Sequence, residues 1–156
     1  MLRTTVAGFA LLALSTAGIA ADVTYRKDIR PLWVKQCSDC HGANAPYLGE
    51  FDEDKKKFEA KRLGPRMDTY ADLIFFVGWP DTGALMRRLD DGKAWGDGKP
   101  GNMYRQLGDT DEERQKNLGL FKQWVGPDAW KPNRWEARGK VPAITKEEMN
   151  KIKVKY

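Results

Sequence analysis

The feature that most constrains this chain is the run Cys37-Ser38-Asp39-Cys40-His41, which holds both of its cysteines and its single histidine. A Cys-x-x-Cys-His run is the attachment signature of c-type haem. Each thiol forms a thioether with a haem vinyl group, and the adjacent imidazole binds the iron. Positions i and i+3 share one face of a helix, so one porphyrin reaches both sulfurs. The run predicts one covalently attached haem c, held by Cys37 and Cys40, with His41 as the proximal ligand.

Other uses of paired cysteines fit this sequence less well. A redox dithiol of the thioredoxin type would lie in a βαβ pattern, and none surrounds residues 37–41. A structural zinc site needs four ligands, and the chain has no further cysteine or histidine to supply them. A chance match to the motif is a third interpretation, but it explains the pattern poorly because the chain has only two cysteines and one histidine. Haem attachment is the interpretation that the motif favours.

The first 21 residues predict export rather than a part of the fold. Arg3 precedes an apolar run over residues 6–14, and small residues follow it. This is the pattern of a signal peptide, and we expect residues 1–21 to be cleaved off near Ala20 or Ala21. The apolar run is short and interrupted for a membrane span, although an uncleaved anchor is an alternative. The mature chain is expected to have no membrane span.

Charge and size narrow the class of protein further. The chain has 27 basic and 22 acidic residues, and the two signs are mixed along it. This excess is too small to predict a nucleic-acid partner, but it is compatible with electrostatic guidance towards an acidic protein. The length suits a single domain with a real core. Because no cysteine is left for a disulfide, stability must come from packing and the cofactor.

Helical patterns run along the chain, and neither strand-period alternation nor an internal repeat is present. We expect the first helix to begin at Asp28 as N-cap and to end at Gly42, so that the haem run lies at its C-terminal end. Further helices are expected at residues 50–61, 70–77, 84–89 and 111–125, and after Thr145. The glycine-rich stretch over residues 93–102 predicts a loop that ends at Met103.

This order of elements resembles class I c-type cytochromes, the small monohaem electron carriers. The resemblance covers roughly residues 25–126, and it rests on the haem run and on the loop, methionine and capped helix that follow it. It implies an all-α, cytochrome c-like fold around one haem. Residues 22–126 would form the cytochrome domain, and residues 127–156 a C-terminal extension packed on it. Because this family attaches its haem outside the cytoplasm, the resemblance also implies a periplasmic location.

The resemblance implies a methionine on the distal side of the iron. Met103 is the best candidate, since it ends a loop just before the last helix of the pattern. Met86 is the main rival, Met67 and Met149 are weaker ones, and the absence of a methionine ligand is a further alternative. A methionine is otherwise an ordinary core residue.

Two other parts of such a haem site have several candidate residues in this sequence: the proline that holds the proximal histidine, and the partners of the haem propionates. A proline carbonyl holds the proximal histidine in the family, and here both Pro46 and Pro65 qualify. Residues able to pair with the haem propionates are Trp79, Trp95, Arg87 and Arg88.

The expected function is that of a periplasmic carrier, moving single electrons between a respiratory donor and a periplasmic redox enzyme through His/Met-ligated iron. Unidentified redox proteins would be its partners. The only histidine is used by iron and no cysteine is spare, so no acid–base or nucleophilic constellation remains for catalysis. Two alternatives stay open: a haem enzyme or gas sensor with an open distal site, and an electron-transfer subunit of a larger reductase or oxidase complex that docks through its aromatic tail.

Overall fold

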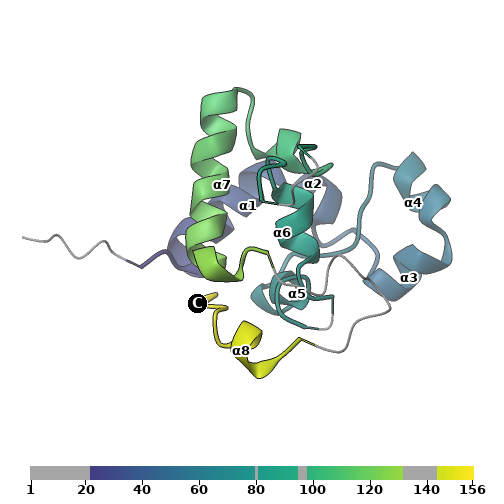
Figure 1. The fold of residues 1–156 in the computed structure, drawn as a ribbon. Coiled ribbons are helices and arrows are strands. Elements are labelled where there is room, and N and C mark those ends of the chain that lie inside the picture. Colours follow the sequence, from purple (N-terminus) through teal and green to yellow (C-terminus); the bar gives the residue numbers. More distant parts are fainter. Residues whose placement is uncertain (1–21, 80, 95–97, 132–143) are drawn as a thin grey trace, which may run out of the picture.

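Helices supply all the regular structure in the residues described, which are 22–79, 81–94, 98–131 and 144–156 of a computed structural model. The expected all-α fold is confirmed. The expectations for residues 1–21 and for Trp95 lie outside these ranges. The α-helices are α1 (Arg30–Gln36), α2 (Ser38–His41), α3 (Leu48–Glu53), α4 (Lys55–Ala60), α5 (Tyr70–Phe75), α6 (Ala84–Leu89), α7 (Asp111–Val125) and α8 (Lys146–Met149) (Figure 1). A π-helical turn, η1 (Tyr25–Ile29), precedes them, and two 3-10 turns are η2 (Tyr104–Leu107) and η3 (Pro127–Ala129).

The first helical segment begins earlier than the sequence analysis expected. Thr24, not Asp28, is the N-cap of η1, because its hydroxyl accepts the amide of Lys27 at 3.2 Å. The Asp28 carboxylate in turn accepts the amide of Thr24 at 2.8 Å. Asp28 therefore lies in the first turn, where a negative charge is favourable, rather than at the cap itself.

A break at Cys37 separates α1 from α2. The backbone of Cys37 leaves helical geometry with φ of −125° and ψ of −23°, and α2 then carries Cys40 and His41 on one short turn. Gly42 follows with φ of −78°, so it is not a left-handed C-cap. A Cβ there would lie 2.4 Å from the carbonyl oxygen of Ser38. A close backbone approach, not the sign of φ, is what requires this glycine.

The core forms around α7, which packs against η1 and η2, while α1 packs against η1 (Figure 1). The hydroxyl of Thr110 caps α7 by accepting the amide of Glu113 at 3.1 Å. Lys35 of α1 reaches the Glu113 carboxylate at 2.8 Å, which links the two helices at the surface. The largest buried side chains of this packing are Ile29, Trp33, Leu118, Phe121 and Trp124.

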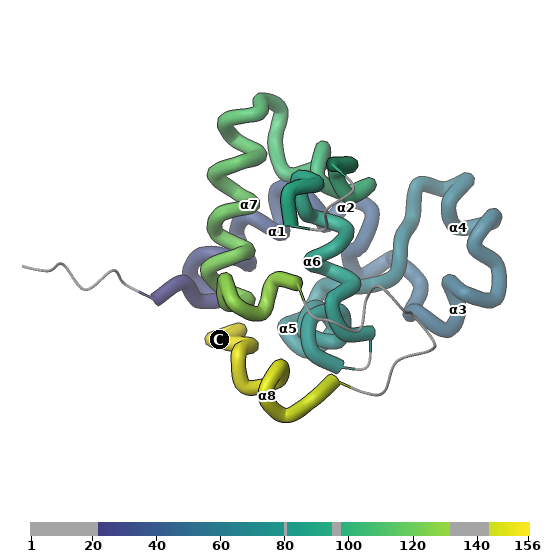
Figure 2. The backbone as a smooth tube through the Cα atoms, viewed as in Figure 1, coloured from purple at the N-terminus to yellow at the C-terminus, as the bar shows by residue number. Residues whose placement is uncertain are grey.

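The C-terminal residues lie beside η1 and the end of α7 (Figures 1 and 2). The Lys155 carbonyl accepts the Tyr25 amide at 2.7 Å and the Trp124 indole N–H at 2.9 Å. The Val154 amide donates to the Trp124 carbonyl at 2.9 Å. The Tyr156 ring stacks on that of Tyr25 with centroids 5.8 Å apart. The last residues thus join the first described turn to the longest helix.

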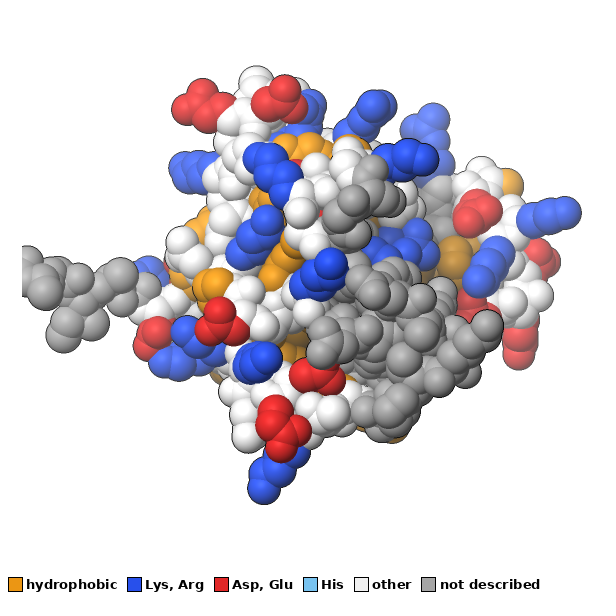
Figure 3. Space-filling model, viewed as in Figure 1, with side chains coloured by type: hydrophobic (Ala, Val, Ile, Leu, Met, Phe, Trp, Pro, Cys, Tyr) orange, Lys and Arg blue, Asp and Glu red, His pale blue; other side chains and the backbone are white. Residues whose placement is uncertain are grey.

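The charge-dense segment after the haem run forms two short helices instead of the expected single one. The backbone of Asp54, with φ of −145° and ψ of 69°, separates α3 from α4. The Phe51 and Phe58 rings stack with centroids 6.3 Å apart and so hold the pair together. Basic and acidic side chains are interspersed on the visible face of the molecule, and also on helices α3 and α4, which lie at the right of Figure 3. None of the helices described has the length and apolar character to cross a bilayer.

Candidate haem site

The imidazole of His41 is held by the carbonyl of Pro65. Its Nδ1 lies 2.7 Å from the Pro65 oxygen, and because a carbonyl only accepts, Nδ1 carries the proton. The neutral ring then has its free electron pair on Nε2, which is the form that binds a metal. Pro65, rather than Pro46, is therefore the proline that orients the histidine.

Gly64 makes room for the His41 ring. A Cβ at this position would lie 2.3 Å from the imidazole Cε1 and 2.8 Å from its Nδ1. Two backbone bonds fix the segment here: the Gly64 amide donates to the Cys40 carbonyl at 2.9 Å, and the Met67 amide donates to the His41 carbonyl at 2.8 Å. The stretch after α4 therefore forms a cradle for the histidine that only glycine allows. Sequence reasoning missed Gly64, although its place just before Pro65 is a usable signal.

Burial lowers the pKa of His41, and the positive charge of Arg88 on α6 lowers it further. The bond to Pro65 acts in the opposite direction. A lowered pKa keeps the ring neutral at physiological pH, as metal binding requires. Arg88 belongs to the last turn of α6, so this end of the helix is near enough for its charge to act on the histidine.

The two cysteines differ in their surroundings. Cys37 is half-buried and packs against the core, whereas Cys40 is exposed. Burial raises the pKa of the Cys37 thiol to about 12. A redox dithiol needs a thiolate with a lowered pKa, so this environment does not favour that alternative. Within the residues described, no three His, Cys, Asp or Glu side chains gather as a metal site either.

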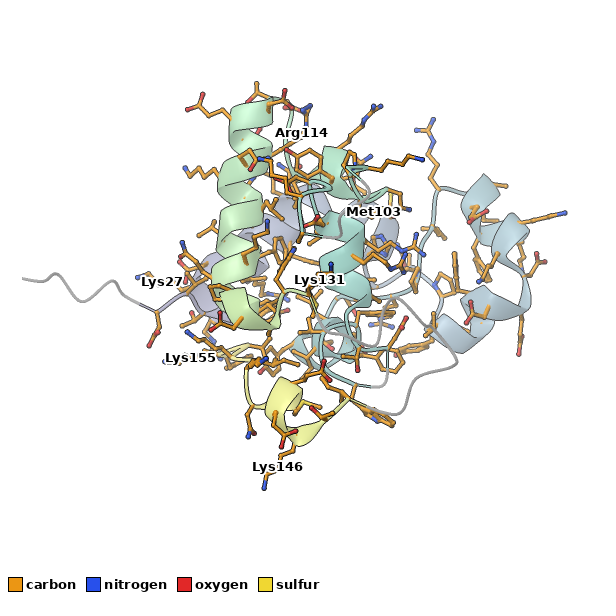
Figure 4. The ribbon with its side chains drawn as sticks, in the orientation of Figure 1. Lys27, Met103, Arg114, Lys131, Lys146 and Lys155 are labelled. Atoms are coloured by element: carbon orange, nitrogen blue, oxygen red, sulfur yellow. The ribbon has the colours of Figure 1, made fainter. Side chains whose placement is uncertain are left out.

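Met103 lies at the end of its loop, directly before η2, and Figure 4 labels it beside α6. Its amide donates to the Arg88 carbonyl at 2.9 Å, and the Arg88 guanidinium donates to the Asn102 side chain at 3.0 Å. The methionine loop is thus joined to the residue whose charge acts on His41. The Met103 side chain is half-buried against the core.

The segment that follows Met103 is also held by hydrogen bonds to α7. The buried Asn117 side chain donates to the Leu107 carbonyl at 2.6 Å, and Gln115 donates to the Tyr104 hydroxyl at 2.8 Å. The turn η2 is therefore bonded to α7 just after Met103. The loop is attached on two sides.

The other methionines are placed less well for a distal ligand. Met86 is fully buried on α6, two residues before Arg88 and so on the opposite side of the helix, where it lines a small cavity with Ala129 and Ile152. Met67 belongs to the cradle, where its amide bonds to the His41 carbonyl. Met149 lies on α8, where its sulfur would be 3.8 Å from a Cβ at Gly78. These three positions suit core or surface packing.

The residues present fit a covalent haem. The chain offers two thiols at haem-attachment spacing, an imidazole with Nδ1 protonated, and a thioether on a loop near the same α6 end. Of the side chains considered for the propionates, Trp79 is largely exposed and Arg88 is exposed on α6. Nothing in the structure assigns either of them to that role.

Comparison with known proteins agrees with this donor set. The family model of the PccH cytochromes c matches residues 24–156. The chain belongs to the PccH cytochrome c family. No curated protein matches it. Among solved structures, it is similar to the monoheme cytochrome PccH from Geobacter sulfurreducens, with 56% identity over 87% of this chain and 100% of that one, and a TM-score of 0.76.

Membership in this family confirms several of the expectations drawn from the sequence. The protein is a monohaem cytochrome c with one covalently attached haem c. Proteins of this kind transfer electrons and are not enzymes, so redox proteins are its partners in general. The family match also extends through residue 156, so it includes the segment after Gly126 that the resemblance to minimal cytochromes left outside.

Proposed function

We propose that the protein is a periplasmic electron carrier in which Cys37 and Cys40 form the thioethers, His41 binds the iron on the proximal side, and Met103 binds it on the distal side. It would pass single electrons between a respiratory donor and a periplasmic redox enzyme. Haem, when bound, supplies the one-electron chemistry. The protein's part is to hold two ligands in fixed positions, so that the oxidation state changes without ligand exchange.

The observation that carries this proposal is the bond between His41 Nδ1 and the Pro65 carbonyl. It selects the tautomer with Nε2 free, and such an outer hydrogen bond also makes the imidazole a stronger donor. Gly64 and Arg88 support the same reading, because they leave room for the ring and disfavour its protonation. A neutral, oriented histidine beside two thiols suits a haem ligand.

Met103 is favoured as the distal ligand by its attachment to Arg88 and α7. A thioether stabilises ferrous iron and raises the reduction potential. Anchoring the loop on two sides keeps the sulfur in place in both oxidation states. This suits a carrier better than an enzyme or sensor, which needs an open site.

The test compares Met103→Ala with Met86→Ala in the holoprotein. Ferric haem with His/Met ligation has a weak sulfur-to-iron charge-transfer band, and we expect Met103→Ala to lose this band and to lower the reduction potential. Met86→Ala should keep the band while it destabilises the core by about 2–5 kcal/mol, because Met86 is fully buried. The opposite pattern would transfer the ligand role to Met86 and refute the assignment.

A further inference from the structure

A buried carboxylate organises the loop between α6 and η2. Asp90 follows α6 directly and is only 1% exposed. Its Oδ2 accepts the amides of Gly92 at 2.9 Å and Ala94 at 3.2 Å, and its Oδ1 accepts the indole N–H of Trp130 at 2.7 Å. A buried charge is costly without such bonds, so these donors are what makes Asp90 tolerable there.

The backbone of Asp90 holds the other end of the same loop. Its carbonyl accepts the amide of Gly101 at 2.8 Å. Gly101 lies so close to α6 that a Cβ would be 2.3 Å from the carbonyl oxygens of Arg87 and Arg88. Met103 follows two residues later, bonded to Arg88. One residue thus fixes both the start of the loop and the segment that leads into Met103.

Trp130 brings the C-terminal extension into this arrangement. The Trp130 indole is 3% exposed. The Nζ atom of Lys122, on α7, lies 5.5 Å from the centroid of this ring and 3.7 Å from Asp90 Oδ1. Figure 2 shows the chain turning back after α7 towards α6, and Figure 4 labels the next residue, Lys131, in that region. The donor that satisfies the buried carboxylate therefore comes from beyond the loop and from beyond the minimal cytochrome pattern.

We propose that Asp90 and Trp130 form a latch by which the C-terminal extension holds the methionine loop in place. Both are positioning residues, because they act on the haem through Met103 and do not touch it. The inference rests on the proposed function, since it takes Met103 as the distal ligand. Without the indole donor, the buried Oδ1 of Asp90 loses its 2.7 Å hydrogen bond and keeps the longer ion pair with Lys122 at 3.7 Å, so the loop opens more readily.

The test measures how fast imidazole replaces the distal methionine in the ferric holoprotein, since this exchange requires the loop to release Met103. Trp130→Phe keeps an aromatic ring and removes only the N–H donor. We expect it to accelerate the exchange at least about tenfold, in line with the loss of a hydrogen bond to a charged group. The fraction of sulfur-ligated ferric haem, read from the charge-transfer band, should fall in parallel.

Trp124→Phe is the matched control. Its indole is also buried and donates to a backbone carbonyl, that of Lys155. Trp124 lies two residues after Lys122, which contacts the latch, and therefore on the opposite side of α7. It should lower global stability while leaving the exchange rate within about twofold of the wild type. An unchanged rate in Trp130→Phe, or an equal acceleration in both variants, would overturn the latch.

Asp90→Asn tests the same contact from the other side and replaces Trp130→Phe if that variant does not mature. The amide keeps the shape of the side chain but offers a single acceptor oxygen, so accelerated exchange is expected again and a wild-type rate refutes the latch. A failure of the proposed function gives a different result from a failure of the latch. If the wild-type ferric protein has no sulfur-to-iron band, the Met103 assignment fails before any variant is compared, and the latch fails with it.

Discussion

At the scale of single residues, the site depends on how His41 is oriented. The Pro65 carbonyl selects the tautomer, Gly64 leaves room for the ring, and Arg88 disfavours the charged form. The sequence identified His41 without ambiguity, because there is no other histidine. It could not choose between Pro46 and Pro65, since that choice depends on how the stretch after α4 folds back onto α2.

The Gly64 cradle predicts a sharp effect of one methyl group. Gly64→Ala should displace the imidazole, because the Cβ would lie 2.3 Å from its Cε1 and backbone bonds hold both segments. We expect a loss of about 1–3 kcal/mol in the free energy of unfolding and a shifted reduction potential, measured by denaturant titration and by voltammetry. Gly49→Ala is the control, since nothing lies within 4 Å of a Cβ there. A wild-type potential in Gly64→Ala would contradict the cradle.

At the scale of elements, capped helices were predictable and their interruptions were not. Thr69, Thr110 and Thr145 each accept the backbone amide that their position predicts. The breaks at Cys37 and Asp54 lie in stretches whose local pattern is helical throughout. Tertiary contacts determine where such helices break, and the periodicity of a single segment carries no information about those contacts.

The segment between α4 and α5 carries the cradle and is held by an ion pair. Arg66 donates to Asp68 through Nε at 2.6 Å and through a second nitrogen at 2.9 Å, and its amide donates to the Pro46 carbonyl at 2.8 Å. The bond from Arg66 lowers the pKa of Asp68 below its ordinary value of 3.8. A carboxylate with a lowered pKa stabilises the fold above its unfolded-state pKa, and this contribution is lost as the pH falls through the lower, folded-state value.

Asp68→Asn should therefore destabilise the protein modestly at pH 7, and the difference from the wild type should shrink as the pH falls below about 4. Chemical denaturation at a series of pH values measures it. Asp52→Asn is the control, because Asp52 pairs with Lys55 in an exposed position where such pairs contribute little. A gap between wild type and Asp68→Asn that persists or widens in acid would argue against the pair.

At the scale of the whole molecule, the C-terminal residues bind both the first described helical turn, η1, and the end of α7. The sequence predicts the segment after Gly126 as an extension, but its pattern does not indicate which backbone groups this segment satisfies. In the structure, Val154 and Lys155 bond to Trp124 and Tyr25, and Trp130 reaches Asp90. These contacts are long-range, so only the assembled fold contains them.

Removal of residues 152–156 should lower the free energy of unfolding by at least about 2 kcal/mol, because backbone hydrogen bonds at the ends of η1 and α7 lose their partners. Thermal unfolding of the holoprotein measures this loss. Lys155→Ala is the control: it removes the exposed pair with Asp22 but keeps the main-chain bonds, so its stability should hardly change. If truncation and Lys155→Ala behave alike, the main-chain contacts do not join the two ends.

The claim that the protein fills both axial positions of the iron is tested most directly by exposing the ferrous holoprotein to carbon monoxide at neutral pH. A closed coordination sphere of His41 and Met103 predicts a Soret spectrum that does not change on the time scale of mixing, while Met103→Ala binds the gas readily. Rapid binding of carbon monoxide by the wild-type protein would mean an open distal site, and it would contradict the account of this cytochrome as an electron carrier.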